Sequence, residues 1–186
     1  MTDDPEYDKL VNKFGDRSSV EAWIAELADD TEFENSSIPF VVVGTIVLWI
    51  AWLFFNGGST TDMYPGKNEK HPVISKIIMN TIISGATGGL VASVLKPWVM
   101  GSYTSRNRYD VGALCNGLLA GLVAITGVCH NVDPWAALII GFIGAVVYAF
   151  ACKLCDWATV DDPIEASSVH GFTGMWGLIA VGIFHN

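Results

Sequence analysis

A histidine near the C-terminus, His170, is the residue in this chain best placed to do chemistry. It stands in the stretch SSVHGFTGMWGLIAVGIF, which is otherwise apolar and close to the length that crosses a bilayer. An ionisable side chain at membrane depth is costly and therefore indicates a function. A lone imidazole among glycine and aliphatic residues suits a narrow pore better than a hydrolytic centre. The alternative is a buried histidine that is hydrogen-bonded to a neighbouring helix.

The cysteines and the other histidines form no recognisable catalytic or metal-binding set. Cys152 and Cys155 make a CxxC pair, but no second pair or nearby histidine completes a zinc site. Cys115 and Cys129 lie at opposite ends of one expected helix, too far apart to bond each other. We interpret all four as packing residues. The histidines expected in loops or at the chain end are predicted to be solvated: His71, His130 and His185. We therefore expect no metal, no cofactor and no enzyme activity.

A helix start signal precedes the histidine. In Asp162-Pro163-Ile164-Glu165, Asp162 would cap the helix, Pro163 would occupy its first position and Glu165 would complete a capping box. His170 would then lie seven residues from Pro163, about 10 Å along the axis. This places the imidazole well inside the apolar slab.

The segments that position this residue are apolar throughout. Hydrophobic residues make up 51% of the chain and charged residues only 16%. Hydropathy predicts spans of roughly the length that crosses ~30 Å of hydrocarbon, at about 38–56, 73–95, 111–128, 135–154 and 163–184. The predicted fold is an all-α, polytopic membrane domain over residues 38–186 with about five transmembrane helices.

The acidic residues are concentrated in an N-terminal tail. Residues 1–37 hold eleven Asp or Glu against three Lys or Arg, whereas the remainder holds eight acids and seven bases. The tail is predicted to be soluble, with a short capped helix beginning near Ser18. The distribution of Lys and Arg weakly favours a cytoplasmic tail. Nothing in the composition suggests nucleic-acid binding, and from the first residues we expect no cleavable signal peptide.

Glycines recur at three- and four-residue spacing within the predicted spans. Such small residues let membrane helices approach closely, and this interpretation is preferred for most of them. On the last span, Gly174 and Gly177 fall on the same face as His170. There they either pack a neighbouring helix or leave room for a lumen beside the imidazole.

Four stretches, in order and spacing, resemble the ammonium transporter family (Amt/Mep/Rh). They are LWIAWLFFNGGS (48–59), ALCNGLLAGLVAIT (113–126), DPWAALIIGF (133–142) and DDPIEASSVHGFTGMWG (161–177). These motifs are most similar to those of the plant-type and other eukaryotic members of the family. The resemblance covers about residues 38–184, leaves the tail uncovered, and is specific because four motifs occur together.

The resemblance implies a role for several side chains. His170 matches the second of the twin histidines that line the hydrophobic pore, and Phe55 matches one of two stacked gating phenylalanines. Ser59 matches a hydroxyl that helps to bind ammonium in the outer vestibule, and Trp52 matches a tryptophan near the pore wall. The implied substrate is ammonium or ammonia.

The resemblance also implies an architecture. Family members have about eleven spans, built as two five-helix halves of inverted topology with the pore between them. The five spans predicted here match the second half, that is, one inverted repeat. Asp162 and Glu165 match acidic positions at the cytoplasmic start of the last helix and are expected to be structural caps. The family suggests a trimer, a cytoplasmic tail and the plasma membrane.

Three hypotheses follow from the match to only one half of the family's architecture. The favoured one is an incomplete half of an ammonium transporter, functional only with a missing first-half helix set, whether it arises as a partial gene model, a truncated product or a split gene. The alternative is a non-conducting membrane protein that associates with full-length transporter subunits. A membrane enzyme that uses His170 is the least favoured, because no nucleophile–base pair or cofactor motif accompanies the histidine.

Overall fold

The computed structural model describes residues 13, 15–16, 18–21, 37–60, 73–101 and 109–184. It divides into two units, residues 1–36 and 37–186. In the first unit, residues 18–21 are helical, and Asp16 Oδ1 accepts a hydrogen bond from the Ser19 N–H at 2.6 Å. The rest of the expected tail helix, residues 22–28, lies outside the described residues.

All regular structure among the described residues of the second unit is helical. The elements are α3 (Ile38–Gly58), α4 (Val73–Met100), α5 (Val111–Ile125), α6 (Pro134–Trp157), a π-helical turn η1 (Ser167–Phe172) and α7 (Thr173–Phe184). Local signals explain several starts. Proline stands in the first turn of α3 and of α6, and Asp110 Oδ1 caps α5 by accepting from the Ala113 N–H at 3.1 Å.

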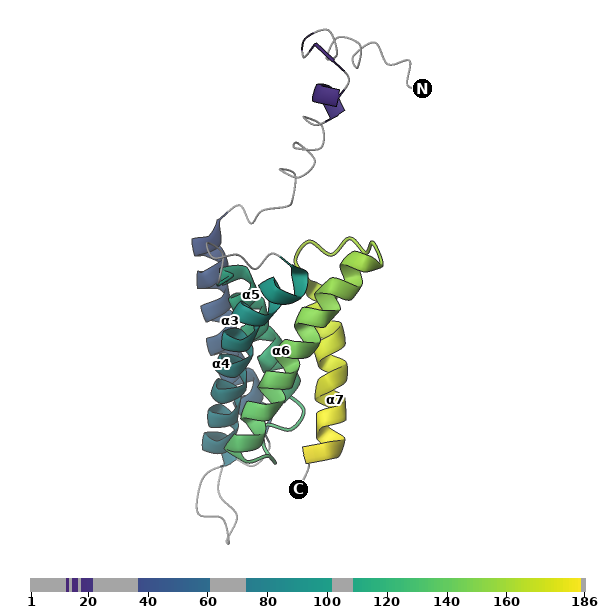
Figure 1. Cartoon of the computed structure of the whole chain (residues 1–186). Coiled ribbons are helices and arrows are strands. Elements are labelled where there is room, and N and C mark those ends of the chain that lie inside the picture. The colour runs from purple at the N-terminus through teal and green to yellow at the C-terminus, as the bar shows by residue number, and fades with distance from the viewer. Residues whose placement is uncertain are drawn as a thin grey trace, which may run out of the picture. The chain divides into compact units, whose positions relative to one another are not determined.

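Successive helices run in opposite directions, and α4, α5 and α6 form the centre of the bundle (Figure 1). Helix α3 packs on α4 and α5, whereas α7 packs on α5 and α6. Helix α5 is the most enclosed element. We call the end that carries residues 126–133 the α5–α6 end, and the end that carries residues 158–166 the α6–α7 end.

Glycine permits close packing of the three central helices. A Cβ atom added at Gly121 would lie 2.3 Å from the Ser84 carbonyl oxygen, and one added at Gly141 would lie 2.4 Å from the same oxygen. The Ser84 hydroxyl donates to the Gly121 carbonyl at 2.8 Å. Backbone contact replaces side-chain packing here, as the small-residue spacing predicts.

Within the ranges that the structure describes, four helical segments are long and apolar enough to cross a membrane: Ile38–Gly58, Val73–Met100, Pro134–Trp157 and Ser167–Phe184. Helix α5 has 15 residues, a length of about 22 Å, and is apolar as well. Large apolar side chains are exposed along α3, α4, α6 and α7, which is the pattern of helices that face lipid. The domain is therefore a helical, multi-pass integral membrane protein.

The last helix begins later than the sequence predicts. Residues 162–165 form a turn in which the Glu165 N–H donates to the Asp162 carbonyl at 2.9 Å, and Glu165 has φ 58°. A helix starting at Pro163 is therefore wrong, and the capping box with Glu165 does not form. Proline is equally suited to the second position of a turn, so the same residues fit both structures.

Candidate functional site

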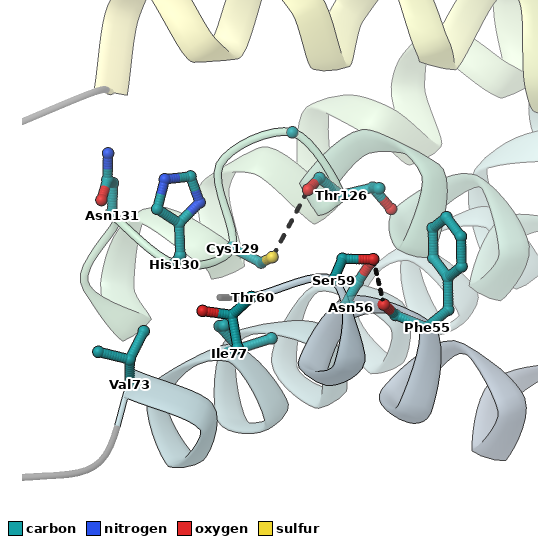
Figure 2. Close-up of a pocket in the computed structure, with 11 residues that line it drawn as sticks. Phe55, Asn56, Ser59, Thr60, Val73, Ile77, Thr126, Cys129, His130 and Asn131 are labelled. Carbon is teal, nitrogen blue, oxygen red and sulfur yellow. Dashed lines mark hydrogen bonds between the residues drawn. The ribbon is translucent and has the colours of Figure 1, made fainter. Parts of the chain in front are cut away.

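A pocket opens at the α5–α6 end, where the C-terminus of α3 meets the turn between α5 and α6. It has a volume of about 520 Å³. We call it the Ser59 pocket. Helix α3 contributes Phe55 and Asn56, the two residues after it contribute Ser59 and Thr60, and α4 contributes apolar side chains. The turn contributes Thr126, Gly127, Cys129, His130 and Asn131 (Figure 2).

Aromatic rings and a hydroxyl group lie together at this pocket. The rings of Trp52 and Phe55 meet edge to face, with centroids 6.0 Å apart and an interplanar angle of 65°. The Ser59 hydroxyl donates to the Phe55 carbonyl at 2.6 Å, which uses its proton and leaves the oxygen able to act as an acceptor. A hydroxyl acceptor beside an aromatic face is suited to a small cation.

Buried hydrogen bonds hold the two walls of the pocket in place. The Trp52 indole N–H donates to the Thr126 hydroxyl at 2.9 Å, which ties α3 to the turn after α5. The Asn56 amide donates to Thr81 on α4 at 3.1 Å. The Asn80 amide donates to the Cys129 and Val132 carbonyls, at 2.9 and 2.7 Å. The pocket is thus built on the central helices rather than on a free loop.

His170 lies elsewhere, in the π-helical turn η1 close to the α6–α7 end. Its side chain is exposed, and its ring makes no hydrogen bond or ion pair within the part of the chain that the structure describes. The alternative of a buried histidine bonded to a neighbouring helix is therefore wrong for the described residues. Gly177 packs against Ala124 of α5, so the glycine below His170 serves packing.

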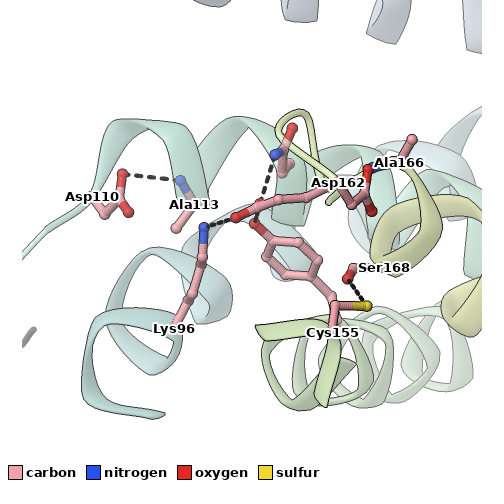
Figure 3. Close-up of polar contacts among 10 residues, drawn as sticks. Lys96, Asp110, Ala113, Cys155, Asp162, Ala166 and Ser168 are labelled. Atoms are coloured by element: carbon pink, nitrogen blue, oxygen red, sulfur yellow. Dashed lines mark hydrogen bonds and ion pairs between the residues drawn. The ribbon is translucent and has the colours of Figure 1, made fainter. Parts of the chain in front are cut away.

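Glu165 gathers partners from three helices at the α6–α7 end. Its carboxylate pairs with the Lys96 ammonium and accepts from the Tyr148 hydroxyl and from the Asn116 amide, the last at 2.8 Å. Figure 3 shows Lys96 reaching into this cluster. Burial acts to raise the pKa of Glu165, but the Lys96 charge and the three donors outweigh it and lower the pKa. We call this cluster the Glu165 junction.

Asp162 contacts the start of the last helix. Its carboxylate accepts from the Ala166 and Ser167 N–H groups, both at 2.8 Å, and from the Ser167 hydroxyl (Figure 3). The small burial of the Asp162 carboxyl opposes ionisation, but these hydrogen bonds prevail and lower its pKa. The contacts are those of a helix cap, whereas the side chain of Glu165 makes none of them.

Among the described residues, no group of three metal-ligating side chains comes together. The four cysteines are free and buried. Cys155 Sγ lies 3.6 Å from the Ser167 hydroxyl and 3.7 Å from that of Ser168, contacts that fit a packing role.

The model of the Ammonium Transporter Family matches residues 21–186. The chain belongs to the ammonium transporter family. Ammonium transporter Amt2 of Archaeoglobus fulgidus is 37% identical over 80% of this chain and 29% of its own length. Ammonium transporter 1 member 1 of Arabidopsis thaliana is 36% identical over 80% of this chain and 29% of its own length.

The fold agrees with the family. The crystal structure of Candida albicans Mep2 superposes with a TM-score of 0.69 at 30% identity, covering 83% of this chain and 31% of that one. The chain thus spans about three tenths of the length of the family members it matches. These relatives are named as transporters rather than as enzymes.

The residues to which the family resemblance assigns a role lie in two separate regions of the structure. The fold brings Phe55 and Ser59 into one pocket with Trp52 beside them, and it separates them from His170, Asp162 and Glu165. Sequence reasoning missed Asn56, Thr126 and Asn131 as pocket residues, although Asn56 and Thr126 stand inside two of the family motifs. It also expected His130 to be merely solvated, whereas this exposed histidine lines the Ser59 pocket.

Proposed function

We propose that this chain forms one wall of a pore for ammonium or ammonia, and that a complementary set of helices forms the other wall. The observation that carries the proposal is His170, which is exposed in a membrane-crossing segment and has no hydrogen-bond partner among the residues that the structure describes. An ionisable ring facing lipid is costly, so a facing protein surface or a water-filled lumen is the favourable surrounding. A twin-histidine pore in this family would supply that surrounding.

The chemistry of the Ser59 pocket supports the same proposal. Phe55 and Ser59 supply an aromatic face and a hydroxyl acceptor, which suit a small cation that donates hydrogen bonds. Beyond the pocket, helices α3 and α7 are almost wholly apolar, and an unneutralised cation would pay a high desolvation cost beside them. A neutral imidazole further along accepts or donates hydrogen bonds to ammonia, or relays a proton.

The assembly is part of the proposal. Helix α3 exposes large apolar side chains on several faces, among them Phe40, Val47 and Phe54. Either lipid or contact with further helices would cover these apolar side chains. We propose a family-like trimer at the plasma membrane with the tail on the cytoplasmic side.

The test is methylammonium uptake in cells that lack their own ammonium transporters. The chain is expressed alone and together with the first five helices of a full-length relative. We expect uptake only with the complementary helices, and we expect His170→Ala to abolish it while His185→Ala, outside the described helices, does not. Uptake by the chain alone would contradict the need for a second wall, and absence of uptake in both cases would contradict the pore.

The exposed apolar surface of α3 equally favours a second candidate, a non-conducting partner of full-length subunits. Co-expression with a complete transporter separates the two. A partner would change the uptake of the complete transporter and would do so equally well with His170→Ala.

A further inference from the structure

His130 is a side chain of the Ser59 pocket that the proposed transport does not yet use. It belongs to the turn between α5 and α6, its side chain is exposed, and it lines the same hollow as Ser59 and Phe55. Figure 2 shows the imidazole between Asn131 and Cys129, with Ser59 and Thr60 across the hollow. A ligand held at Ser59 therefore shares its pocket with an imidazole.

The other ionisable groups near this pocket can be named element by element. Helix α3 has no ionisable residue between Ile38 and Gly58. On α4, Lys76 faces Asp133 of the turn, with Nζ and Oδ1 3.8 Å apart, so the two charges offset each other. Burial raises the pKa of the Cys129 thiol to about 11, so it remains neutral. Residues 61–72, which include His71, lie outside the described residues.

Among the described residues at this pocket, His130 is thus the side chain that can be present either as a neutral acceptor or as a cation. The charge matters because the expected ligand is itself a cation. A neutral imidazole nitrogen accepts a hydrogen bond from an N–H donor, whereas an imidazolium only donates and repels positive charge. The two forms therefore have opposite effects on a cation in the same hollow.

We propose that His130 is an additional binding group of the Ser59 pocket, which favours a small ammonium-type cation when neutral and disfavours it when protonated. This inference rests on the proposed function, because it assigns the pocket to cation capture. It makes capture dependent on the pH of the compartment that the α5–α6 end faces. Ammonium and methylammonium remain protonated near neutral pH and below, so the change lies in the protein.

The size of the effect follows from Coulomb's law. Two like unit charges that share a largely aqueous pocket repel each other enough to weaken binding roughly three- to tenfold. We therefore expect the half-saturating concentration of methylammonium to rise by that factor between about pH 7.5 and 5.5. The maximal rate carries no such expectation.

The experiment compares three forms of the assembled transporter, that is, the chain with its complementary helices. His130→Gln keeps a hydrogen-bonding side chain without a titrating charge, so the ratio of the half-saturating concentrations at the two pH values should approach one. His130→Lys carries a permanent charge and should show weak binding at both pH values. Asp156→Asn, which removes an exposed charge near the α6–α7 end, is a control that should keep the wild-type ratio.

A second measurement, methylammonium binding to the purified chain in detergent, is followed by tryptophan fluorescence because Trp52 lies beside Phe55. If uptake occurs but His130→Gln keeps the wild-type pH ratio, this inference is overturned and the proposed function stands. If binding occurs without uptake, the pH ratio of the binding constants decides the role of His130 in the same way. If neither binding nor uptake occurs at either pH, both proposals are overturned.

Discussion

Glu165 concentrates more polar contacts than its position in the sequence suggests. It accepts from Lys96, Asn116 and Tyr148, which come from three different helices. The side chains of Lys96 and Glu165 are only 14% and 24% exposed, so the pair is far from a freely solvated one. Such a carboxylate joins the α6–α7 connection to the central helices, and its loss would leave a poorly solvated ammonium group without its counter-charge.

We predict that Glu165→Gln destabilises the purified chain by about 2 kcal/mol at neutral pH, because a partly buried lysine loses its charged acceptor. Since folding lowers the pKa of Glu165, its contribution is present above the unfolded-state pKa of about 4.3 and is lost as the pH falls through the lower folded-state value. Thermal unfolding of wild type and Glu165→Gln in detergent, at pH 7 and at about pH 3, measures the loss of stability and its dependence on pH.

The control for this prediction is Asp156→Asn, which removes an exposed carboxylate near the same end of the bundle. We expect it to change the stability by less than about 0.5 kcal/mol. The gap between wild type and Glu165→Gln should narrow as the pH falls. A gap of equal size at both pH values would show that the charge of Glu165 contributes nothing.

Asp162 has a separate role at the same connection. It accepts from two backbone N–H groups at the start of the last helix. We predict that Asp162→Ala lowers the stability by about 1 kcal/mol, whereas Asp162→Asn, which keeps one of the two acceptor oxygens, lowers it by less. Thermal unfolding compares the two variants, and equal losses would indicate that the negative charge rather than the hydrogen bonding is what matters.

At the scale of the helices, the contact between α4 and α5 depends on the absence of side chains. A Cβ atom at Gly121 would meet the Ser84 carbonyl oxygen at 2.3 Å, whereas one at Gly182 of α7 would meet nothing within 4 Å. Alanine is favoured over glycine in a helix by about 1 kcal/mol. Forcing a packed interface apart costs about 1–3 kcal/mol. At Gly121 the gain in helix propensity is opposed by the packing cost, whereas at Gly182 no packing cost opposes it.

We therefore predict opposite signs for two chemically identical changes. Gly182→Ala should leave the thermal stability unchanged or slightly higher, and Gly121→Ala should lower it, with Gly121→Val lower still. Melting temperature and the monodisperse fraction in size-exclusion chromatography report the result. A tolerated Gly121→Val would mean that the central helices are more loosely packed than their backbones indicate.

The helical membrane fold could be predicted from the sequence because apolar length is a local property. The start of the last helix could not. Asp162-Pro163 fits a helix cap and a turn equally well, and the turn is favoured by Glu165 reaching Lys96 and Tyr148, which are distant in sequence. His130 is exposed in a loop, as predicted, but its place in the pocket could not be predicted, for a related reason. Its loop position was predictable, but the approach of Ser59 from another helix was not.

At the scale of the whole molecule, the membrane domain has a buried core of three helices and much exposed apolar surface. Helices α4, α5 and α6 bury most of the core, whereas α3 and α7 lie on either side and pack on different pairs of these helices. His170 is exposed on η1, at the start of the membrane-crossing segment that η1 and α7 form. Lipid and a second helical wall would both cover the apolar surface, but only the second wall would also surround the imidazole. Lipid or detergent and a second helical wall therefore differ in how far they protect position 170 from a thiol reagent in solution.

We predict that a cysteine placed at His170 is protected when the complementary helices are present. The four native cysteines are buried and should react slowly with a small maleimide. His170→Cys in the chain alone, in detergent, should label readily, and co-purification with the first five helices of a relative should slow labelling roughly tenfold. Phe150→Cys on α6, where the native side chain is 54% exposed, is the matched control and should label at the same rate in both preparations. Equal labelling of His170→Cys with and without those helices would place the face of His170 against lipid and would favour the non-conducting partner over the pore wall.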